Sequence, residues 1–144
     1  MMKPHEYRTQ IRERHLDSFG HVNNAQYLVL FEEARWEMIT SRGYGLKQVM
    51  ENGVGTVILS CSVKFKRELS VRDWIRVETE LVSLEKKIGL IRQHIYRESD
   101  GKLAALGEFQ MGCFDLRERK LIQPSSSWLY AITGEHVTLD DFKS

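Results

Sequence analysis

The stretch Asp17-Ser18-Phe19-Gly20-His21-Val22-Asn23-Asn24-Ala25-Gln26-Tyr27 joins a polar turn to the most apolar helical segment of the sequence. Asn23 or Asn24 can cap the exposed amides of a first turn, and Gly43 can supply a left-handed stop. The pattern therefore predicts one helix over residues 24–42. Its apolar side chains cover most of the first two turns, so we expect them to be wrapped on nearly all sides. They are Tyr27, Leu28, Val29, Leu30, Phe31, Ala34, Met38 and Ile39.

Downstream of this helix the apolar pattern changes to a period of two, which indicates β-strands. Four such segments follow one another, at residues 54–66, 75–81, 88–96 and 103–113. The turns between them are short, and one contains the hairpin signal Asp100-Gly101, so an antiparallel meander is predicted. A weaker strand over residues 5–16 has a polar outer side and is expected at a sheet edge.

A sheet with one apolar face must cover that face, and residues 24–42 form the one strongly apolar helix available. We therefore expect the α+β class, with a curved antiparallel sheet wrapped around one central helix. Shorter helices are expected at residues 44–52 and after Pro124, the latter ending at Gly134. The 144 residues should form a single domain, 1–144, in which about residues 135–144 are a peripheral tail.

The formal net charge is only +1, which gives no electrostatic case for nucleic acid or a membrane surface as a partner. No apolar run approaches the roughly 18 residues that a membrane span needs, and residues 1–6 lack the apolar core of a secretory signal. Cys61 and Cys113 lie far apart and lack metal-ligand spacing. We interpret them as two buried, reduced thiols of a cytoplasmic protein.

Several familiar catalytic patterns are absent, among them the Gly-x-Ser-x-Gly elbow, the phosphate-binding loop and His-Glu-x-x-His. What remains is a carboxylate, Asp17, a few residues ahead of a helix N-terminus. Amides at that position can stabilise a carbonyl oxygen that gains negative charge during acyl transfer. Asp17 could act on such a carbonyl as general base or as nucleophile. From the residues alone, it could also serve only as a cap or turn former.

The same stretch carries a family resemblance. The pattern Asp17-x-x-Gly20-His21-x-Asn23-Asn24-x-x-Tyr27, followed by Phe31-Glu32-Glu33-Ala34-Arg35, resembles the signature of hotdog-fold acyl-CoA thioesterases of the 4-hydroxybenzoyl-CoA thioesterase type. The resemblance implies the hotdog fold and a hydrolase that cleaves an acyl-CoA thioester to a free carboxylic acid and coenzyme A. It also implies no metal or other cofactor beyond the coenzyme A of the substrate. The implied assembly is a homo-oligomer, dimer or tetramer, with each site at a subunit interface.

Carried over residue by residue, the resemblance assigns the catalytic carboxylate to Asp17 and the carbonyl-polarising backbone amide to Asn24. Gly20 matches a glycine that lets a ligand approach the backbone closely. His21 either orients Asp17 or the attacking water, or simply packs into the turn. Tyr27 is a candidate residue of the acyl-binding site.

The phosphates of coenzyme A would need cations, and a basic group follows the first long strand. Its members are Lys64, Lys66, Arg67 and Arg72. Lys64 and Arg67 are therefore candidate substrate-binding residues, although a solvated strand face explains the pattern equally well. The family often has Pro where this chain has Glu68, so the shape of this loop stays open.

Some hotdog enzymes draw the carboxylate from the central helix instead. Glu33 lies nine residues beyond Asn24, about 13 Å along a helix axis, which is too far to serve a carbonyl held by that amide in the same subunit. Glu32 with Arg35 is interpreted as an i, i+3 ion pair. Two other functions remain open: a non-catalytic acyl-thioester binding module, and an enoyl-thioester hydratase that would use His21 with a carboxylate. Acyl preference, and coenzyme A against acyl carrier protein as the carrier, are not predicted.

Overall fold

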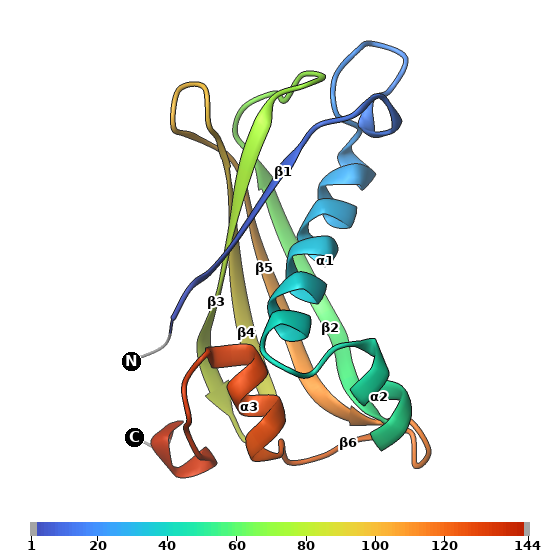
Figure 1. Cartoon of the computed structure of the whole chain (residues 1–144), viewed down its shortest axis with the longest axis vertical. Coiled ribbons are helices and arrows are strands. Elements are labelled where there is room, and N and C mark those ends of the chain that lie inside the picture. Colours follow the sequence, from blue (N-terminus) through green and yellow to red (C-terminus); the bar gives the residue numbers. More distant parts are fainter. Residues whose placement is uncertain (1–2, 143–144) are drawn as a thin grey trace.

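The computed structural model describes residues 3–142 of the chain. Its main strands are β1 (His5–Gln10), β2 (Val54–Phe65), β3 (Trp74–Glu85), β4 (Ile88–Arg97) and β5 (Lys102–Asp115). They form one antiparallel sheet in the order β1-β3-β4-β5-β2, and the short strand β6 (Lys120–Leu121) pairs with β5. The sheet curves around helix α1 (Asn24–Ser41), as expected from the sequence (Figure 1).

Helix α1 begins and ends close to where the sequence predicts. Asn23 caps it by accepting a hydrogen bond from the Ala25 amide at 2.8 Å, and Gly43 follows its last turn with a φ of 88°. One expectation is wrong for the single chain, because Leu28 and Val29 are 42% and 41% exposed. Apolar side chains on all sides of a helix indicate that it must be packed against other elements. They do not indicate whether those elements belong to the same chain. The buried residues of α1 are Tyr27, Leu30, Phe31, Ala34, Met38 and Ile39.

The predicted meander of four long strands is wrong at its first step, because β2 pairs with β5 and not with β3. Strands β3, β4 and β5 do follow one another as neighbours. Residues 66–73 carry the chain from β2, at one edge of the sheet, across to β3 (Figure 1). An alternating pattern shows that a strand has one buried face but does not specify its neighbour, so the sequence could not distinguish these orders.

Strands β1 and β2 form the two edges of the sheet. The predicted edge position of β1 is confirmed, although the strand is shorter than expected because Glu13–His15 form the 3-10 helix η1. Strand β2 is the longer edge, and the register shifts between Ile58 and Ser60. This irregularity interrupts the alternation of faces. The alternation within residues 54–66 puts Leu59 and Phe65 on the apolar face of this strand, yet both are exposed in the single chain.

The two shorter helices that the sequence predicts are confirmed as α2 (Leu46–Asn52) and α3 (Ser126–Thr133). Each is followed by a glycine in the left-handed conformation, Gly53 and Gly134. Both helices lie at the end of the sheet opposite to the loop that precedes α1 (Figure 1). They therefore close one end of the core and leave the other end to the loops.

The segment predicted as a peripheral tail, about residues 135–144, is described as far as residue 142. Within it Val137 is buried, and Leu139–Phe142 form the 3-10 helix η2. The described residues do not include the last two residues of this tail, 143 and 144. They also exclude residues 1 and 2, which belong to the N-terminal segment predicted to lack a secretory signal.

Candidate active site

Asp17 lies in the loop between η1 and α1. Its Oδ1 atom accepts hydrogen bonds from the amides of Phe19 at 2.8 Å and His21 at 3.4 Å. Its own amide donates to the His21 carbonyl at 2.8 Å. One carboxylate oxygen therefore forms the turn, which the sequence allowed as an alternative role. The other oxygen, Oδ2, has no hydrogen-bond partner within residues 3–142, so turn formation leaves it open to a further role.

Hydrogen bonds from three directions hold this loop in place. The Val22 amide donates to the Leu69 carbonyl at 3.2 Å, and His21 forms an isolated β-bridge with Ser70. The Asn23 amide donates to the His15 carbonyl at 3.0 Å. The connection between β2 and β3 thus fixes the loop relative to the start of α1, and sequence reasoning did not identify this contact.

The first turn of α1 presents one unpaired amide. The Asn23 side chain satisfies the amide of Ala25, and the Gln26 amide donates to the Asn23 carbonyl at 2.9 Å. The amide of Asn24 has no acceptor in the part of the chain that the structure describes. Because a helix N-terminus carries partial positive charge, this N–H is suited to a carbonyl oxygen or an anion.

The imidazole of His21 is paired with a different carboxylate from the one considered in the sequence. Its Nε2 atom lies 3.2 Å from Oε2 of Glu68, and both side chains are largely exposed. The contact between His21 and Asp17 runs through the backbone of His21. The structure therefore brings His21 together with the residue that stands where the family often has proline.

The candidate substrate-binding residues occupy different surroundings. Gly20 adopts a φ of 84°, and a side chain there would meet open space. Tyr27 is buried, its ring packs edge-on against Phe65, and its hydroxyl donates to the Arg67 carbonyl at 3.4 Å. The Arg67 guanidinium donates to the Leu103 carbonyl at 2.9 Å. Tyr27 and Arg67 thus have structural partners within the chain, whereas Gly20 faces solvent.

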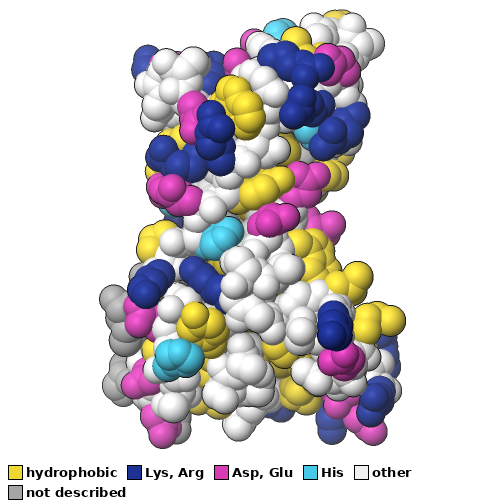
Figure 2. All heavy atoms as spheres, in the orientation of Figure 1, with side chains coloured by type: hydrophobic (Ala, Val, Ile, Leu, Met, Phe, Trp, Pro, Cys, Tyr) yellow, Lys and Arg dark blue, Asp and Glu magenta, His cyan; other side chains and the backbone are white. Residues whose placement is uncertain are grey.

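The predicted basic group lies at the end of β2 and in the connection that follows, close to the Asp17 loop. Arg72 is paired with Glu13 at 2.7 Å, so part of its charge is already used. Lys64, Lys66 and Arg67 are exposed. Lys and Arg side chains gather at this end of the molecule (Figure 2). The site thus lies beside a surface that carries several exposed Lys and Arg side chains.

The predicted ion pair between Glu32 and Arg35 is wrong. Nη1 of Arg35 donates instead to Oε1 of Gln93 at 2.9 Å, because this turn of α1 faces the sheet and a strand residue is in reach. Glu33 points elsewhere, and its Oε2 accepts a hydrogen bond from the Tyr7 hydroxyl at 3.4 Å. The helical spacing rule identified neighbours on the helix but not the competing partner on β4.

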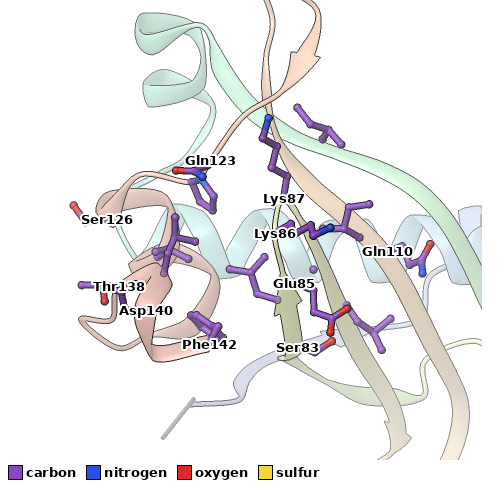
Figure 3. Close-up of a pocket in the computed structure, with 18 residues that line it drawn as sticks. Ser83, Glu85, Lys86, Lys87, Gln110, Gln123, Ser126, Thr138, Asp140 and Phe142 are labelled. Carbon is purple, nitrogen blue, oxygen red and sulfur yellow. The ribbon is translucent and has the colours of Figure 1, made fainter. Parts of the chain in front are cut away.

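Two cavities lie away from Asp17. The larger has a volume of about 1510 Å³. It is lined by the β3–β4 hairpin, by the segment that leads into α3 and by η2 (Figure 3). The smaller, about 290 Å³, lies between α1, α2 and β2. Neither is lined by Asp17 or Asn24. In the single chain Asn24 is exposed and Asp17 is half-buried, and both lie outside these two cavities.

His15 was not identified from the sequence, although it lies two residues before Asp17. It is 1% exposed, its Nδ1 accepts a hydrogen bond from the Arg12 amide at 2.8 Å, and its Nε2 has no partner within the described residues. Burial lowers the pKa of His15, because the charged form would lose hydration. No sequence signal marks this residue, because its burial arises only when the chain folds.

The remaining titratable groups give no sign of a metal centre. Within residues 3–142, no group of three His, Cys, Asp or Glu side chains is arranged to hold a metal ion. Cys61 and Cys113 are both free, but the predicted burial is wrong for Cys61, which lies exposed on the edge strand β2. Cys113 is buried, and burial raises its pKa to about 11. No helix among the described residues is long and apolar enough to cross a membrane.

Comparisons with known proteins bear on this geometry. A family model described as the thioesterase-like superfamily matches residues 11–132. The chain is 30% identical to the long-chain acyl-CoA thioesterase FadM of Escherichia coli over 116 residues, which cover 79% of this chain and 87% of that protein.

Solved structures share the fold. A hypothetical protein of Staphylococcus aureus in complex with CoA superposes with a TM-score of 0.83 at 20% identity, over 92% of this chain and 83% of the other. The 1,4-dihydroxy-2-naphthoyl-CoA thioesterase of Synechocystis gives a TM-score of 0.82 at 21% identity, over 90% of this chain and 96% of that protein. The predicted hotdog fold is confirmed, and with the family match over most of its length the chain belongs to the thioesterase-like superfamily.

Proposed function

We propose that this protein is a hydrolase that cleaves an acyl-CoA thioester to a free carboxylic acid and coenzyme A. Its family and its similarity to a named acyl-CoA thioesterase support this class of reaction. The observation that carries the proposal is the unpaired amide of Asn24 at the start of α1, next to a loop that positions the Asp17 carboxylate. These two groups have the chemistry needed to stabilise a developing oxyanion and to deliver a nucleophile.

In the proposed reaction, the thioester carbonyl oxygen accepts a hydrogen bond from the Asn24 amide. Asp17 then either removes a proton from an attacking water or attacks the carbonyl carbon through its free oxygen. The carbon–sulfur bond breaks, and coenzyme A leaves as a thiolate that takes up a proton. If Asp17 is the nucleophile, water hydrolyses the acyl-aspartyl anhydride in a second step. Neither route uses a metal or a further cofactor, so we expect a chelator to leave the rate unchanged.

The surroundings of Asp17 suggest roles for its neighbours. Gly20 leaves open space in which a thioester could approach the loop. Lys64 and Arg67, at the end of β2, would meet the phosphates of coenzyme A, and Arg67 keeps donors beyond the one it gives to Leu103. His21, held near Glu68, would orient the loop rather than transfer a proton.

The proposal includes a homo-oligomer, a dimer or a tetramer, in which a second copy covers the open surface at Asp17. Leu28 and Val29 on α1 leave an apolar stripe exposed, and β2 has an unpaired edge within the described residues. Both features call for a partner surface. We place the enzyme in the cytoplasm, a reducing compartment that suits its two free thiols.

Turnover of a panel of acyl-CoAs, followed by detection of the released thiol, tests the reaction. Asp17→Asn keeps the shape of the side chain and should lower kcat by about 10²–10⁴-fold, the usual contribution of a positioned base. Glu33→Gln is the matched control, because it removes a carboxylate from α1, and its rate should stay within a few-fold of wild type. Equal rates for the wild type and Asp17→Asn would remove Asp17 from the mechanism.

Two further outcomes would replace the proposal. Calorimetric binding of acyl-CoA without thiol release under any condition would identify a non-catalytic binding module. Loss of enoyl absorbance from an enoyl-CoA, again without thiol release, would identify a hydratase.

A further inference from the structure

The side chain of Arg35 is a cation placed between α1 and the sheet. Its Nη1 donates to Oε1 of Gln93 at 2.9 Å, and its guanidinium carbon lies 4.5 Å from the centre of the Phe109 ring. Burial lowers the pKa of Arg35, but an arginine remains charged in proteins. The neighbours that it contacts are thus a neutral amide and an aromatic ring.

Arg35 has no close counter-ion within residues 3–142, where no carboxylate forms an ion pair with it. Glu32 lines the same cavity as Arg35, but it forms no ion pair with Arg35, acts on it from a greater distance and is exposed to solvent. Removing an unpaired charge from water is costly unless a ligand or partner compensates it. This cation therefore has an unused capacity to bind an anion.

The side chain behind Arg35 is held in one orientation. Gln93 is fully buried, and its amide nitrogen donates to the Phe31 carbonyl at 3.0 Å and to the Thr79 hydroxyl at 2.9 Å. With its nitrogen committed in this way, the oxygen of Gln93 must face Arg35. The guanidinium is thus oriented by a network that starts on β3 and β4.

Arg35 lines the cavity of about 290 Å³. This volume lies just below the usual range for small-molecule sites, about 300–1,000 Å³. A guanidinium has five N–H donors, and one hydrogen bond of Arg35 is identified here. Among the described residues, the buried polar atoms that have no hydrogen-bond partner do not include any nitrogen of Arg35. The apolar lining includes Met38, Ile39, Val49, Ile91, Leu116 and Ile132.

We propose that this cavity binds the far end of the acyl group and that Arg35 selects acyl groups that carry a carboxylate there. The apolar lining would take the methylene groups of such a chain. The free N–H groups of the guanidinium would donate two hydrogen bonds to the terminal carboxylate, strengthened by the low dielectric of the site. The acyl part of this inference rests on the proposed hydrolase function, whereas the anion site does not.

Binding of simple esters tests the site without any hydrolysis step. Monomethyl suberate carries an apolar chain with one carboxylate, and methyl octanoate has the same chain length without the charge. By calorimetry, the wild type should bind monomethyl suberate at least tenfold more tightly than methyl octanoate. In Arg35→Met this preference should fall below threefold. Equal affinities of the wild type for the two esters would overturn the inference.

A second variant covers the case in which Arg35→Met does not fold. Ile58 lines the same cavity and is 38% exposed, so a polar side chain there is tolerated more easily. Ile58→Glu adds a carboxylate at the cavity wall and should weaken binding of monomethyl suberate at least tenfold. Ile58→Gln, the matched neutral control, should keep the preference of the wild type. Full preference in Ile58→Glu would contradict a role of this cavity.

Turnover of octanoyl-CoA and suberyl-CoA separates this inference from the proposed function. If both are hydrolysed with equal kcat/KM and the esters bind equally, the inference fails and the hydrolase remains. If the ester preference is present but neither thioester releases thiol, the hydrolase proposal fails and the anion site remains. We expect suberyl-CoA to be preferred at least tenfold in kcat/KM, and Arg35→Met to lose that preference.

Discussion

Oδ1 of Asp17 lies 2.8 Å from the amide nitrogen of Phe19, while Oδ2 of the same carboxylate is unpaired within residues 3–142. One oxygen thus shapes the loop, and the other is available for chemistry. A cap or turn former and a catalytic carboxylate are therefore compatible roles of a single side chain.

Substitutions at Asp17 should separate these two roles. Asp17→Asn keeps an oxygen acceptor for the Phe19 amide, whereas Asp17→Ala removes it. We expect Asp17→Ala to lower the free energy of unfolding by about 1 kcal/mol and Asp17→Asn by less than half as much. Both should lose thioester hydrolysis. Urea unfolding measures the stabilities, and equal stability losses in the two variants would contradict the turn-forming role.

Stability should fall in mild acid because of His15. Its pKa is lowered in the folded protein by burial, so below its ordinary value of 6.5 the unfolded chain binds a proton that the folded chain does not. The contribution of neutral His15 to the free energy of unfolding is therefore fully present above about pH 6.5. It is lost as the pH falls toward the lowered pKa of the folded protein. His5 shifts in the same direction, mainly through burial and then through Arg42.

Urea unfolding near pH 7.5 and near pH 5.5 tests this dependence. His15→Gln should be less stable than the wild type at the higher pH, but should lose less stability between the two conditions. A wild-type stability that rises toward pH 5.5 would contradict the direction. An unchanged pH dependence in His15→Gln would assign the effect to other groups.

Gly107 should not tolerate even a methyl group. An added Cβ would lie 2.7 Å from a ring carbon of Phe109 and 3.1 Å from one of Phe31, in a site without exposure. Overpacking of this kind typically costs about 1–3 kcal/mol, which we expect for Gly107→Ala in urea unfolding. Combining it with Phe109→Leu should cost less than the sum of the single changes, because the smaller side chain makes room. Strict additivity would show that the ring contact is not the cause.

Leu28 should matter for assembly more than for folding. Because it is 42% exposed in the single chain, Leu28→Lys should leave secondary structure unchanged while shifting the oligomer toward monomer in sedimentation experiments. Leu46→Lys on α2, at a residue that is 60% exposed, is the matched control and should not change the assembly. If Leu46→Lys dissociated the oligomer and Leu28→Lys did not, the interface would lie at α2 and not at α1.

The sequence could identify the features that depend on neighbouring residues. Asn23 and Gly43 delimit α1 through local hydrogen bonds and local backbone conformation, and both predictions hold. The pairing of β2 with β5 could not be read in this way, because alternation leaves the partner strand unspecified. The same limit explains Arg35, whose partner Gln93 lies 58 residues away and replaces the expected ion pair on the helix.

The features of the candidate site also fall into those that a local sequence pattern marks and those that depend on the fold. Asp17 and Asn24 stand out because both lie in one contiguous polar segment ahead of an apolar helix. The backbone of Leu69, which holds that segment, carries no side-chain signal for its role. The anion-binding capacity of Arg35 also depends on strands brought to it by the fold, so no local pattern marks it.

The connection between β2 and β3 has a consequence for how such an enzyme can diversify. Its backbone at Leu69 is hydrogen-bonded to the segment that holds Asp17, whereas most of its side chains are exposed to solvent. We expect an inserted or deleted residue there to reorient the Asp17 carboxylate, the proposed reacting group, without changing Asp17 itself. In the proposed mechanism, a change in the length of this surface linker would therefore alter turnover while the reacting groups stay the same.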